Sequence, residues 1–242
     1  MTRTRADLLL VARGLAESRA KARAAIEAGG VTANGALVEK ASDLVEEGAD
    51  LTIAAPHPWV SRAGVKLAAA LDTFDVDPAG RVCLDVGAST GGFTQVLLSR
   101  GAAHVYAVDV GTAQLHASLR DDPRVANLER TDARALTREA IVEPPSLVVC
   151  DASFIGAIKV LLAPMKLGAA SADLIALIKP QFEAGPKAVG KTGVLDEETA
   201  RAAAAQTIAA LEGVEGFRKV AVADSPIRGG EGNLELLLHM RR

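Results

Sequence analysis

The sequence predicts an α/β protein with a mostly parallel sheet, preceded by a small basic α+β domain. From about Gly80 onward, short apolar runs alternate with helix-like stretches. Strands that alternate with helices form parallel sheets covered on both faces. Before this region, basic residues are concentrated at the start of the chain. A length of 242 residues suits one ordinary domain with a small appendage.

The composition excludes several classes of protein. With 49% hydrophobic residues, 24% charged residues and a net charge of −3, the chain is typical of soluble globular proteins. Apolar runs such as Leu174–Ile178 fall well short of the ~20 residues that span a bilayer, and no signal peptide is recognisable. Cys83 and Cys150 lie inside apolar runs, which predicts reduced core thiols and a cytoplasmic protein. We expect no metal, no membrane contact and no disulfide scaffold.

Charge separates sharply within the first 50 residues. Residues 1–26 hold six basic and two acidic residues (net +4), whereas residues 27–50 hold one basic and six acidic residues (net −5). This separation predicts a basic face that binds nucleic acid. The elements expected here are helices at Asp7–Arg13 and Arg19–Ala28, a strand at Val31–Ala33, a hairpin turn at Asn34–Gly35 and a strand at Leu51–Ile53.

Two prolines in three residues, Pro56 and Pro58, predict a linker. We therefore expect domains at 1–54 and 61–242, joined by residues 55–60. The strands predicted in the second domain are Val82–Val86, Val105–Val110, Leu147–Asp151, Leu174–Lys179, Lys219–Ala223 and Leu234–Met240. The last two have no room between them for a crossover helix, so they are predicted to pair antiparallel.

A glycine-rich segment, Asp85–Phe93, follows the first of these strands. In open α/β folds such a turn lies at the sheet edge where ligands bind. Asp109, about 20 residues further on, is placed to accept ribose hydroxyls. Asp132 follows the next strand, where it can meet an adenine edge, although either acid can also serve as a helix N-cap. A carboxylate at Asp85 favours a cationic ligand over a pyrophosphate, so S-adenosylmethionine fits better than NAD.

Four ionisable residues stand beside apolar strands or on an apolar helix: Lys66, Asp151, Lys179 and Glu235. Such charges are seldom buried without partners. Each alone is compatible with a half-exposed position at a strand end. Together, two bases and two acids can converge near the glycine loop.

Five motifs resemble, in order, those of the TlyA (hemolysin A) family of ribosomal RNA 2′-O-methyltransferases, whose catalytic domain is FtsJ-like. The motifs are Trp59–Leu67, Asp85–Thr94, Cys150–Ile155, Ile178–Glu183 and Gly232–Glu235. The resemblance implies a Rossmann-like methyltransferase sheet with an antiparallel final strand. It also implies a first domain similar to the RNA-binding domain of the fourth small-subunit ribosomal protein, on Ser18–Arg19, Gly30–Val31 and Asn34–Gly35. Ala63, where the family commonly has glycine, and His57–Pro58 depart from the pattern.

By this resemblance, Lys66, Asp151, Lys179 and Glu235 are the catalytic tetrad. A ribose hydroxyl must lose its proton as it attacks a methyl group, and a lysine accepts that proton only when neutral. Lys179 is the candidate base, with Lys66 as a neighbour of like charge. A second ammonium favours the neutral form, whereas the two carboxylates oppose it. Alignment of the reacting atoms is therefore expected to carry much of the acceleration.

The resemblance implies S-adenosylmethionine as cofactor and a cytidine of 23S ribosomal RNA as substrate, with 16S as a further substrate in some members. The chain stops directly after the last strand, as in the shorter, 23S-directed form. The predicted cofactor-binding residues are Asp85, Gly87, Ala88, Ser89, Thr90, Gly91, Gly92, Phe93, Asp109, Asp132 and Asp151. The predicted RNA contacts are Arg3, Arg5, Arg19, Lys21, Arg23 and Lys40, for which a solvated charged helix face is the alternative. Arg134 and Arg228 are candidates for additional phosphate contacts. Phe154, Phe182 and Trp59 are candidates for base stacking, although each is more typical of a packing residue.

Three other functions are alternatives to this one. A dehydrogenase shares the sheet but requires a loop compatible with a pyrophosphate. A non-catalytic RNA-binding assembly factor needs the basic domain and no four-residue site. A membrane-lytic protein needs an exposed amphipathic or spanning segment, and the sequence contains no recognisable one.

Overall fold

The computed structural model describes residues 2–27, 29–53, 57–190, 193–229 and 232–242. The chain divides into two compact units, Met1–Pro58 and Trp59–Arg242. Residues 54–56, where the predicted first domain passes into the predicted linker, lie outside the described residues.

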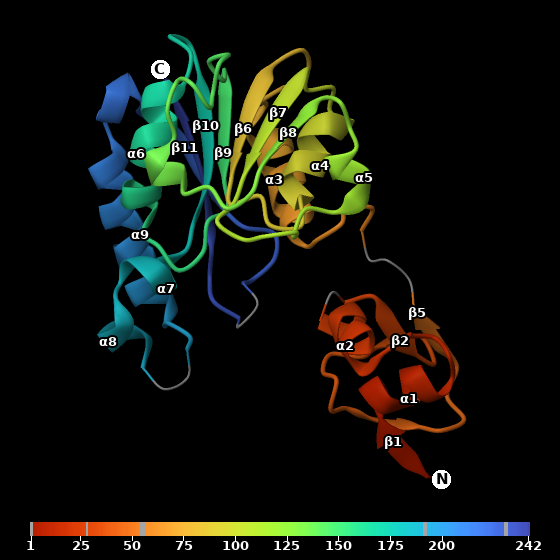
Figure 1. The fold of residues 1–242 in the computed structure, drawn as a ribbon. Coiled ribbons are helices and arrows are strands. Elements are labelled where there is room, and N and C mark those ends of the chain that lie inside the picture. Colours follow the sequence, from red (N-terminus) through yellow and green to blue (C-terminus); the bar gives the residue numbers. More distant parts are fainter. Residues whose placement is uncertain (1, 28, 54–56, 191–192, 230–231) are drawn as a thin grey trace. The chain divides into compact units, whose positions relative to one another are not determined.

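The first unit is a small α+β domain, drawn in red and orange in Figure 1. Its described elements are β1 (Arg3–Arg5), α1 (Ala6–Ala12), α2 (Arg19–Glu27), β2 (Val31–Ala33), β3 (Ala36–Leu37), β4 (Leu44–Glu46) and β5 (Leu51–Ile53). β2 pairs with β3 and β5, and β1 pairs with β4, all antiparallel. The predicted helices and hairpin are confirmed, except that Ala28 lies outside the described residues. Asn34 and Gly35 both have positive φ, as a tight hairpin turn requires.

The second unit is built on one seven-stranded sheet with the order β11-β12-β10-β9-β6-β7-β8 (Figure 1). Its strands are β6 (Val82–Val86), β7 (His104–Val108), β8 (Val125–Leu128), β9 (Leu147–Cys150), β10 (Asp173–Ile178), β11 (Arg218–Asp224) and β12 (Leu236–Arg241). β12 runs antiparallel to both of its neighbours, β10 and β11, whereas the pairs from β10 to β8 are parallel. The predicted antiparallel final pair is therefore confirmed.

Besides β9, which ends at Cys150 rather than at Asp151, two strands are shorter than predicted. β7 ends at Val108 because the Asp109 carboxylate accepts hydrogen bonds from the backbone N–H groups of Ser89 and Gly111, at 2.8 and 2.7 Å, which turn the chain away from the sheet. β12 begins at Leu236, so Glu235 lies just before the strand, at the edge of the sheet. Both shifts place carboxylates where ligands bind in this class of fold.

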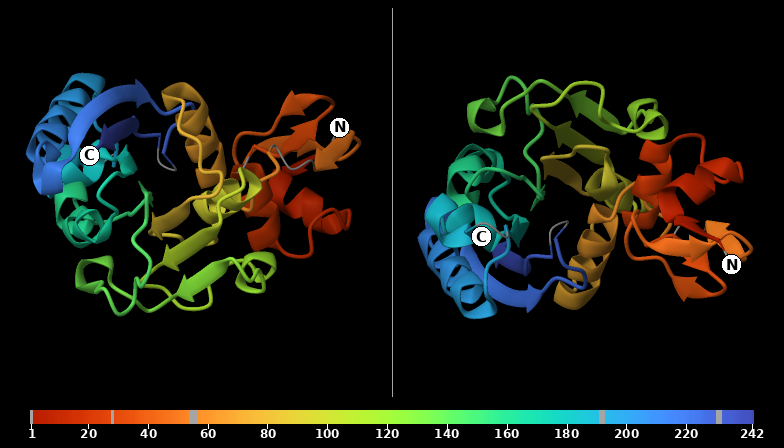
Figure 2. Two further views of the ribbon diagram at one scale, coloured as in Figure 1. Left: turned by 90° about the horizontal axis from the view of Figure 1, so that it is seen from above. Right: turned by 90° about the horizontal axis from the view of Figure 1, so that it is seen from below.

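Helices cover both faces of the sheet. They are α3 (Ala63–Phe74), α4 (Gly92–Ser99), α5 (Ala117–Arg120), α6 (Ala157–Leu167), α7 (Pro180–Glu183), α8 (Pro186–Val189) and α9 (Glu197–Leu211), with short 3₁₀ turns η1 (Ala133–Ala135) and η2 (Val214–Gly216). Alternate strand residues belong to two separate hydrophobic clusters: one includes Leu84 with α6 and α9, the other includes Cys83 with α3 and α4. Figure 2, which views the sheet end-on, shows these two helix layers within the second unit.

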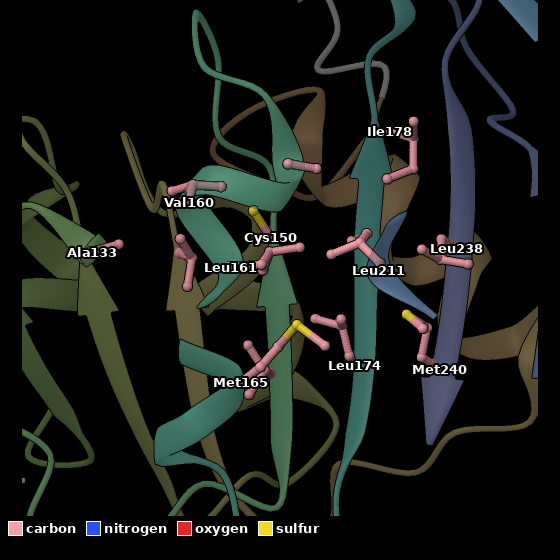
Figure 3. Packing of buried hydrophobic residues seen from close by; sticks show 14 of the residues in the cluster. Ala133, Cys150, Val160, Leu161, Met165, Leu174, Ile178, Leu211, Leu238 and Met240 are labelled. Atoms are coloured by element: carbon pink, nitrogen blue, oxygen red, sulfur yellow. The ribbon is translucent and has the colours of Figure 1, made fainter. Parts of the chain in front are cut away.

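The cluster beneath α6 and α9 is closely packed (Figure 3). Leu161 and Met165 of α6, Leu174 of β10, Leu211 of α9 and Leu238 of β12 all belong to it. All five side chains are fully buried. This core holds the ends of β9, β10 and β12 in a fixed arrangement, and the predicted catalytic residues follow or precede those ends.

The described helices include none that is long and apolar enough to cross a bilayer. Cys83 and Cys150 are free and buried in β6 and β9. Burial raises the pKa of each thiol to about 12, so both remain protonated at neutral pH.

Candidate active site

The glycine loop between β6 and α4 passes very close to the end of β9. Gly87 has a φ of +84°, and a Cβ at this position would lie 2.9 Å from Ala152 Cα. Only glycine fits such a backbone conformation at this distance. The close approach brings the loop and residues 151–153 to one place at the carboxyl edge of the sheet.

A cavity of about 510 Å³ opens beside this loop, and we name it the donor cavity. Its volume lies within the ~300–1,000 Å³ typical of small-molecule sites. Five of the predicted cofactor residues line it: Gly87, Ser89, Asp109, Asp132 and Asp151. Its wall also contains residues that were not predicted from the sequence, including Val110, Gly111, Gln114, Ala152 and Ser153.

Asp109 is held rigidly at the rim of the donor cavity. One carboxylate oxygen accepts the Ser89 N–H and the other accepts the Gly111 N–H. Each oxygen keeps a further lone pair, so the carboxylate can accept both hydroxyls of a ribose. The residues present therefore fit an adenosine group.

Asp132 lines the donor cavity and is also an N-cap, the alternative that the sequence left open. Its carboxylate accepts the backbone N–H of Arg134 at 2.9 Å and pairs with the Arg134 guanidinium, so it caps the η1 turn. These contacts hold the pKa of Asp132 below its usual value. It lines the donor cavity as an ionised, internally paired group, which leaves less freedom to bind an adenine edge.

Three predicted cofactor residues, Asp85, Gly91 and Gly92, lie outside the cavity walls described here. The Asp85 side chain is completely buried and accepts a hydrogen bond from Thr94 Oγ1 at 2.7 Å. Burial raises the pKa of this carboxyl to about 7, whereas the sequence argument assumed a charged carboxylate next to the cofactor. Gly92 lies against Ser61 and Gly64 at the start of α3, where a side chain would overlap them.

A second cavity, of about 270 Å³, lies on the α3 side of the loop, and we name it the acceptor cavity. Ser61, Arg62 and Lys66 line it from α3 and the segment before it. The glycine loop contributes predicted residues Ala88, Thr90 and Phe93. Gly87, Ser89, Asp151 and Ser153 line both cavities, so the two cavities meet at these four residues.

The predicted tetrad forms two buried ion pairs at this junction. Lys179 Nζ lies 2.7 Å from Asp151 Oδ1, and Lys66 Nζ pairs with Glu235 Oε2. Lys66, Lys179 and Glu235 are each 7% exposed or less. In the β10–β12 register Ile178 faces Leu236, so the next residues outward, Lys179 and Glu235, lie at adjacent strand ends. Lys66 and Asp151 line the same cavity, which connects the pairs.

Known proteins resemble the chain over nearly its whole length. The family model for FtsJ-like methyltransferases matches residues 59–242, and the S4 domain model matches residues 4–51. A 16S/23S rRNA (cytidine-2′-O)-methyltransferase TlyA from Mycobacterium tuberculosis is 47% identical over 241 residues, covering 99% of this chain and 90% of that protein. Hemolysin A from Brachyspira hyodysenteriae is 38% identical over 236 residues, covering 97% and 98%. The chain belongs to the TlyA (hemolysin A) family of FtsJ-like methyltransferases.

The fold agrees with this assignment. A solved structure described as a hemolysin, from Streptococcus thermophilus, has a TM-score of 0.77 and 37% sequence identity, covering 100% of this chain and 89% of that one. S-adenosylmethionine is the cofactor of this TlyA-family chain, and the donor cavity is the site whose residues fit it.

The S4 domain of this TlyA-family chain gathers four of the six predicted RNA contacts. Arg5, Arg19, Arg23 and Lys40 line one groove, together with Asp7. Arg5 and Arg19 both bind the buried Asp7 carboxylate, at 3.0 and 2.9 Å, and they hold its pKa well below its usual range. These two arginines therefore stabilise the domain as well as presenting positive charge.

The other two predicted RNA contacts, Arg3 and Lys21, lie outside this groove. Arg3 lies 3.6 Å from Glu46, and Lys21 pairs with Glu17. We name the surface of Arg5, Arg19, Arg23 and Lys40 the basic groove.

The aromatic residues considered for base stacking differ in exposure. Phe154 is 90% exposed at the rim of the donor cavity, has a φ of +66°, and packs against Phe182 with 5.2 Å between ring centres. Trp59 instead packs against the hydrophobic cluster beneath α3, and its ring leaves no space for a side chain at Gly64. Of these residues, Phe154 presents the most open face for stacking.

One wall of the donor cavity depends on a residue that the sequence did not indicate. The Glu129 carboxylate accepts the backbone N–H groups of Ala113, Gln114 and Leu115, at 2.6 to 3.0 Å. These bonds lower the pKa of Glu129 and hold the segment that carries Gly111 and Gln114. No local sequence pattern identifies Glu129, because the backbone N–H groups that it binds lie 14 to 16 residues earlier in the chain.

Proposed function

We propose that this protein transfers the methyl group of S-adenosylmethionine to the ribose 2′-hydroxyl of a cytidine in ribosomal RNA. The observation that carries the proposal is the meeting of the donor and acceptor cavities at Asp151, beside two buried lysine–carboxylate pairs. The TlyA relative from M. tuberculosis bears the same activity in its name, with 16S and 23S RNA as substrates. A cytidine of 23S RNA is the first expected target, and the cytoplasm, where ribosomes are found, is the expected place.

When bound, S-adenosylmethionine supplies a methyl group on a positively charged sulfur. The Asp109 carboxylate binds the hydroxyls of its ribose, and the acceptor cavity receives the RNA ribose. In methyl transfer, a bond forms between the 2′-oxygen and the methyl carbon, the carbon–sulfur bond breaks, and the hydroxyl proton must leave. We assign that proton to Lys179, which lies at the junction.

In this scheme Lys179, paired with Asp151, accepts the proton, and Lys66 is paired with Glu235. Proton transfer of this kind contributes ~10²–10⁴-fold, which is about 3–5 kcal/mol. Holding oxygen, methyl carbon and sulfur in line can supply ~7–11 kcal/mol, so alignment is expected to be the larger contribution.

The alternative, an RNA-binding assembly factor without catalysis, explains the basic groove but not the second unit. Two buried ion pairs cost desolvation energy and stabilise a fold less well than apolar residues of similar size. Their location between two cavities favours a catalytic role over a structural one.

The first test replaces Lys179. A Lys179→Ala variant is expected to lose at least ~100-fold in methyl transfer, because the proton acceptor is gone. It is expected to bind S-adenosylmethionine as the wild type does, because Lys179 lies outside the donor cavity walls described above. Ribosomal subunits from cells lacking the protein would be incubated with methyl-labelled cofactor, and cofactor binding would be measured by calorimetry.

Lys166→Ala, at an exposed lysine of α6, serves as the control and should retain full activity. Mass spectrometry of the RNA identifies the modified nucleotide. Full turnover by Lys179→Ala would remove Lys179 as the base. An unmodified RNA with the wild-type protein would support the assembly factor instead.

A further inference from the structure

Ser153 contacts the reaction centre although it is not part of the tetrad. It follows β9 by three residues, and its hydroxyl oxygen accepts a hydrogen bond from Lys179 Nζ at 2.7 Å. It also lines both the donor and the acceptor cavity. The Ser153 hydroxyl therefore lies where methyl donor and acceptor oxygen have to meet.

The contacts of Lys179 show why this hydroxyl matters. An ammonium has three hydrogens, and Lys179 Nζ has three oxygen neighbours: Asp151 Oδ1 at 2.7 Å, the Asp151 carbonyl oxygen at 3.0 Å and Ser153 Oγ at 2.7 Å. Two of these belong to Asp151. The Ser153 hydroxyl is the one of these three oxygens that does not belong to Asp151, so removing it leaves Nζ with the two Asp151 oxygens.

The hydroxyl also has hydrogen-bonding capacity left over. A serine hydroxyl has one hydrogen and two lone pairs, and the contact with Lys179 uses one lone pair. Because Ser153 is exposed at the junction of the two cavities, its hydrogen and second lone pair are available to a ligand there. A ribose hydroxyl, which both donates and accepts, is the chemical group that matches them.

We propose that Ser153 is a positioning residue for methyl transfer: its hydroxyl holds Lys179 Nζ at the cavity junction and hydrogen-bonds the ribose hydroxyl that accepts the methyl group. The proposal rests on the function proposed above. It adds a residue that binds both the tetrad lysine and the acceptor, and it assigns no proton transfer to the serine itself.

The test compares Ser153→Ala with Ser153→Thr, which keeps the hydroxyl, and with Ser171→Ala, an exposed serine before the opposite end of β10. Single-turnover methylation of ribosomal subunits would be measured at saturating cofactor. Ser153→Ala is expected to slow the reaction ~10–100-fold, because displacement of a catalytic group by about 1 Å can cost ~10²-fold. Ser153→Thr should restore most of the rate, Ser171→Ala should match the wild type, and cofactor affinity should be unchanged.

Ser153→Thr separates positioning from a merely structural role. A variant that keeps the hydroxyl restores the contact with Lys179 Nζ, whereas a change in the shape of the 151–155 loop would not be rescued by a larger side chain.

A wild-type rate in Ser153→Ala would overturn the proposal. Equal losses in the Ala and Thr variants, with weaker cofactor binding, would overturn it as well, because they indicate loop shape. Failure of the wild-type protein to methylate RNA is a separate result, which contradicts the proposed function before any variant is compared.

Discussion

Asp85 is the residue at which burial changes the chemistry most clearly. It lies in β6 directly before the glycine loop, with a fully buried side chain. Desolvation raises its pKa to about 7, and the hydrogen bond from Thr94 only partly opposes this effect. A carboxyl group that the sequence presents as a negative charge is therefore close to half protonated at neutral pH.

This raised pKa makes stability depend on pH. Below about pH 4 the carboxyl is protonated in both the folded and the unfolded state. Between about pH 4 and pH 7 the unfolded chain ionises while the folded chain keeps the proton, so the free energy of unfolding falls as pH rises, by at most about 1.4 kcal/mol per pH unit from this group. In an Asp85→Asn variant this contribution should be absent.

Urea denaturation of both proteins from pH 4 to pH 8 measures the difference. The stability of the wild type relative to Asp85→Asn should fall up to about pH 7 and then level off. Asp121→Asn, at an exposed carboxylate, is the matched control and should leave the profile unchanged. Parallel profiles for the wild type and Asp85→Asn would contradict a raised pKa.

At the scale of elements, the close contact of α3 with α4 positions Lys66. Gly92 begins α4, and a Cβ there would overlap Ser61 Oγ and lie 2.9 Å from Gly64 N. Because this neighbour is backbone, the contact cannot relax through a side-chain rotation. Glycine at position 92 therefore sets the distance between α4 and the first turn of α3. The contact is at Gly64, two residues before Lys66.

Gly92→Ala is expected to push α3 outward and to displace Lys66 from Glu235. Overpacking of this kind costs ~1–3 kcal/mol of stability. Methylation should fall by more than cofactor affinity does, because Gly92 is not among the residues that line the donor cavity. Thermal unfolding and calorimetry measure the two effects, with Gly48→Ala, where a Cβ meets nothing within 4 Å, as the control. Wild-type stability and activity would show that α3 tolerates the extra methyl group.

At the scale of the whole molecule, binding and chemistry are divided between two units of opposite character. The S4 domain presents the basic groove on a small surface, whereas the methyltransferase unit buries its charges as pairs. Residues 1–58 hold seven basic and eight acidic residues, so the positive charge of the first unit is local to this groove. RNA affinity should therefore depend on salt mainly through the first unit.

Lys40→Ala is expected to weaken binding to RNA whatever the RNA sequence. The logarithm of the association constant should fall less steeply with the logarithm of the salt concentration, by about 0.7–0.9 in slope, which is the value of one phosphate contact. Stability should not change, because the Lys40 side chain is exposed. Filter binding of ribosomal RNA at several salt concentrations gives the slope, and Lys219→Ala on β11 is the control. Arg19→Ala should lower both RNA affinity and stability, since the buried Asp7 then loses a partner. An unchanged slope for Lys40→Ala would exclude Lys40 as a phosphate contact.

Much of the fold was predictable because it depends on local patterns. Alternating apolar runs located the strands, and Asn34–Gly35 located a hairpin. Element ends were less predictable, because contacts distant in sequence set them: β7 stops where Asp109 binds Ser89 and Gly111. For the same reason, the sequence did not indicate that Glu129 supports a wall of the donor cavity.

The sequence by itself determined the family, the fold class and the residue types of the candidate site, because these follow from motif order and hydrophobic periodicity. Only the tertiary structure decided how the charges combine: Lys66 with Glu235, and Lys179 with Asp151 and Ser153. It also decided that Asp85 is buried away from solvent, that Gly92 spaces two helices, and that two arginines hold Asp7. The physical reason is that ion pairing and desolvation depend on distances between residues far apart in the chain, which a linear pattern does not contain.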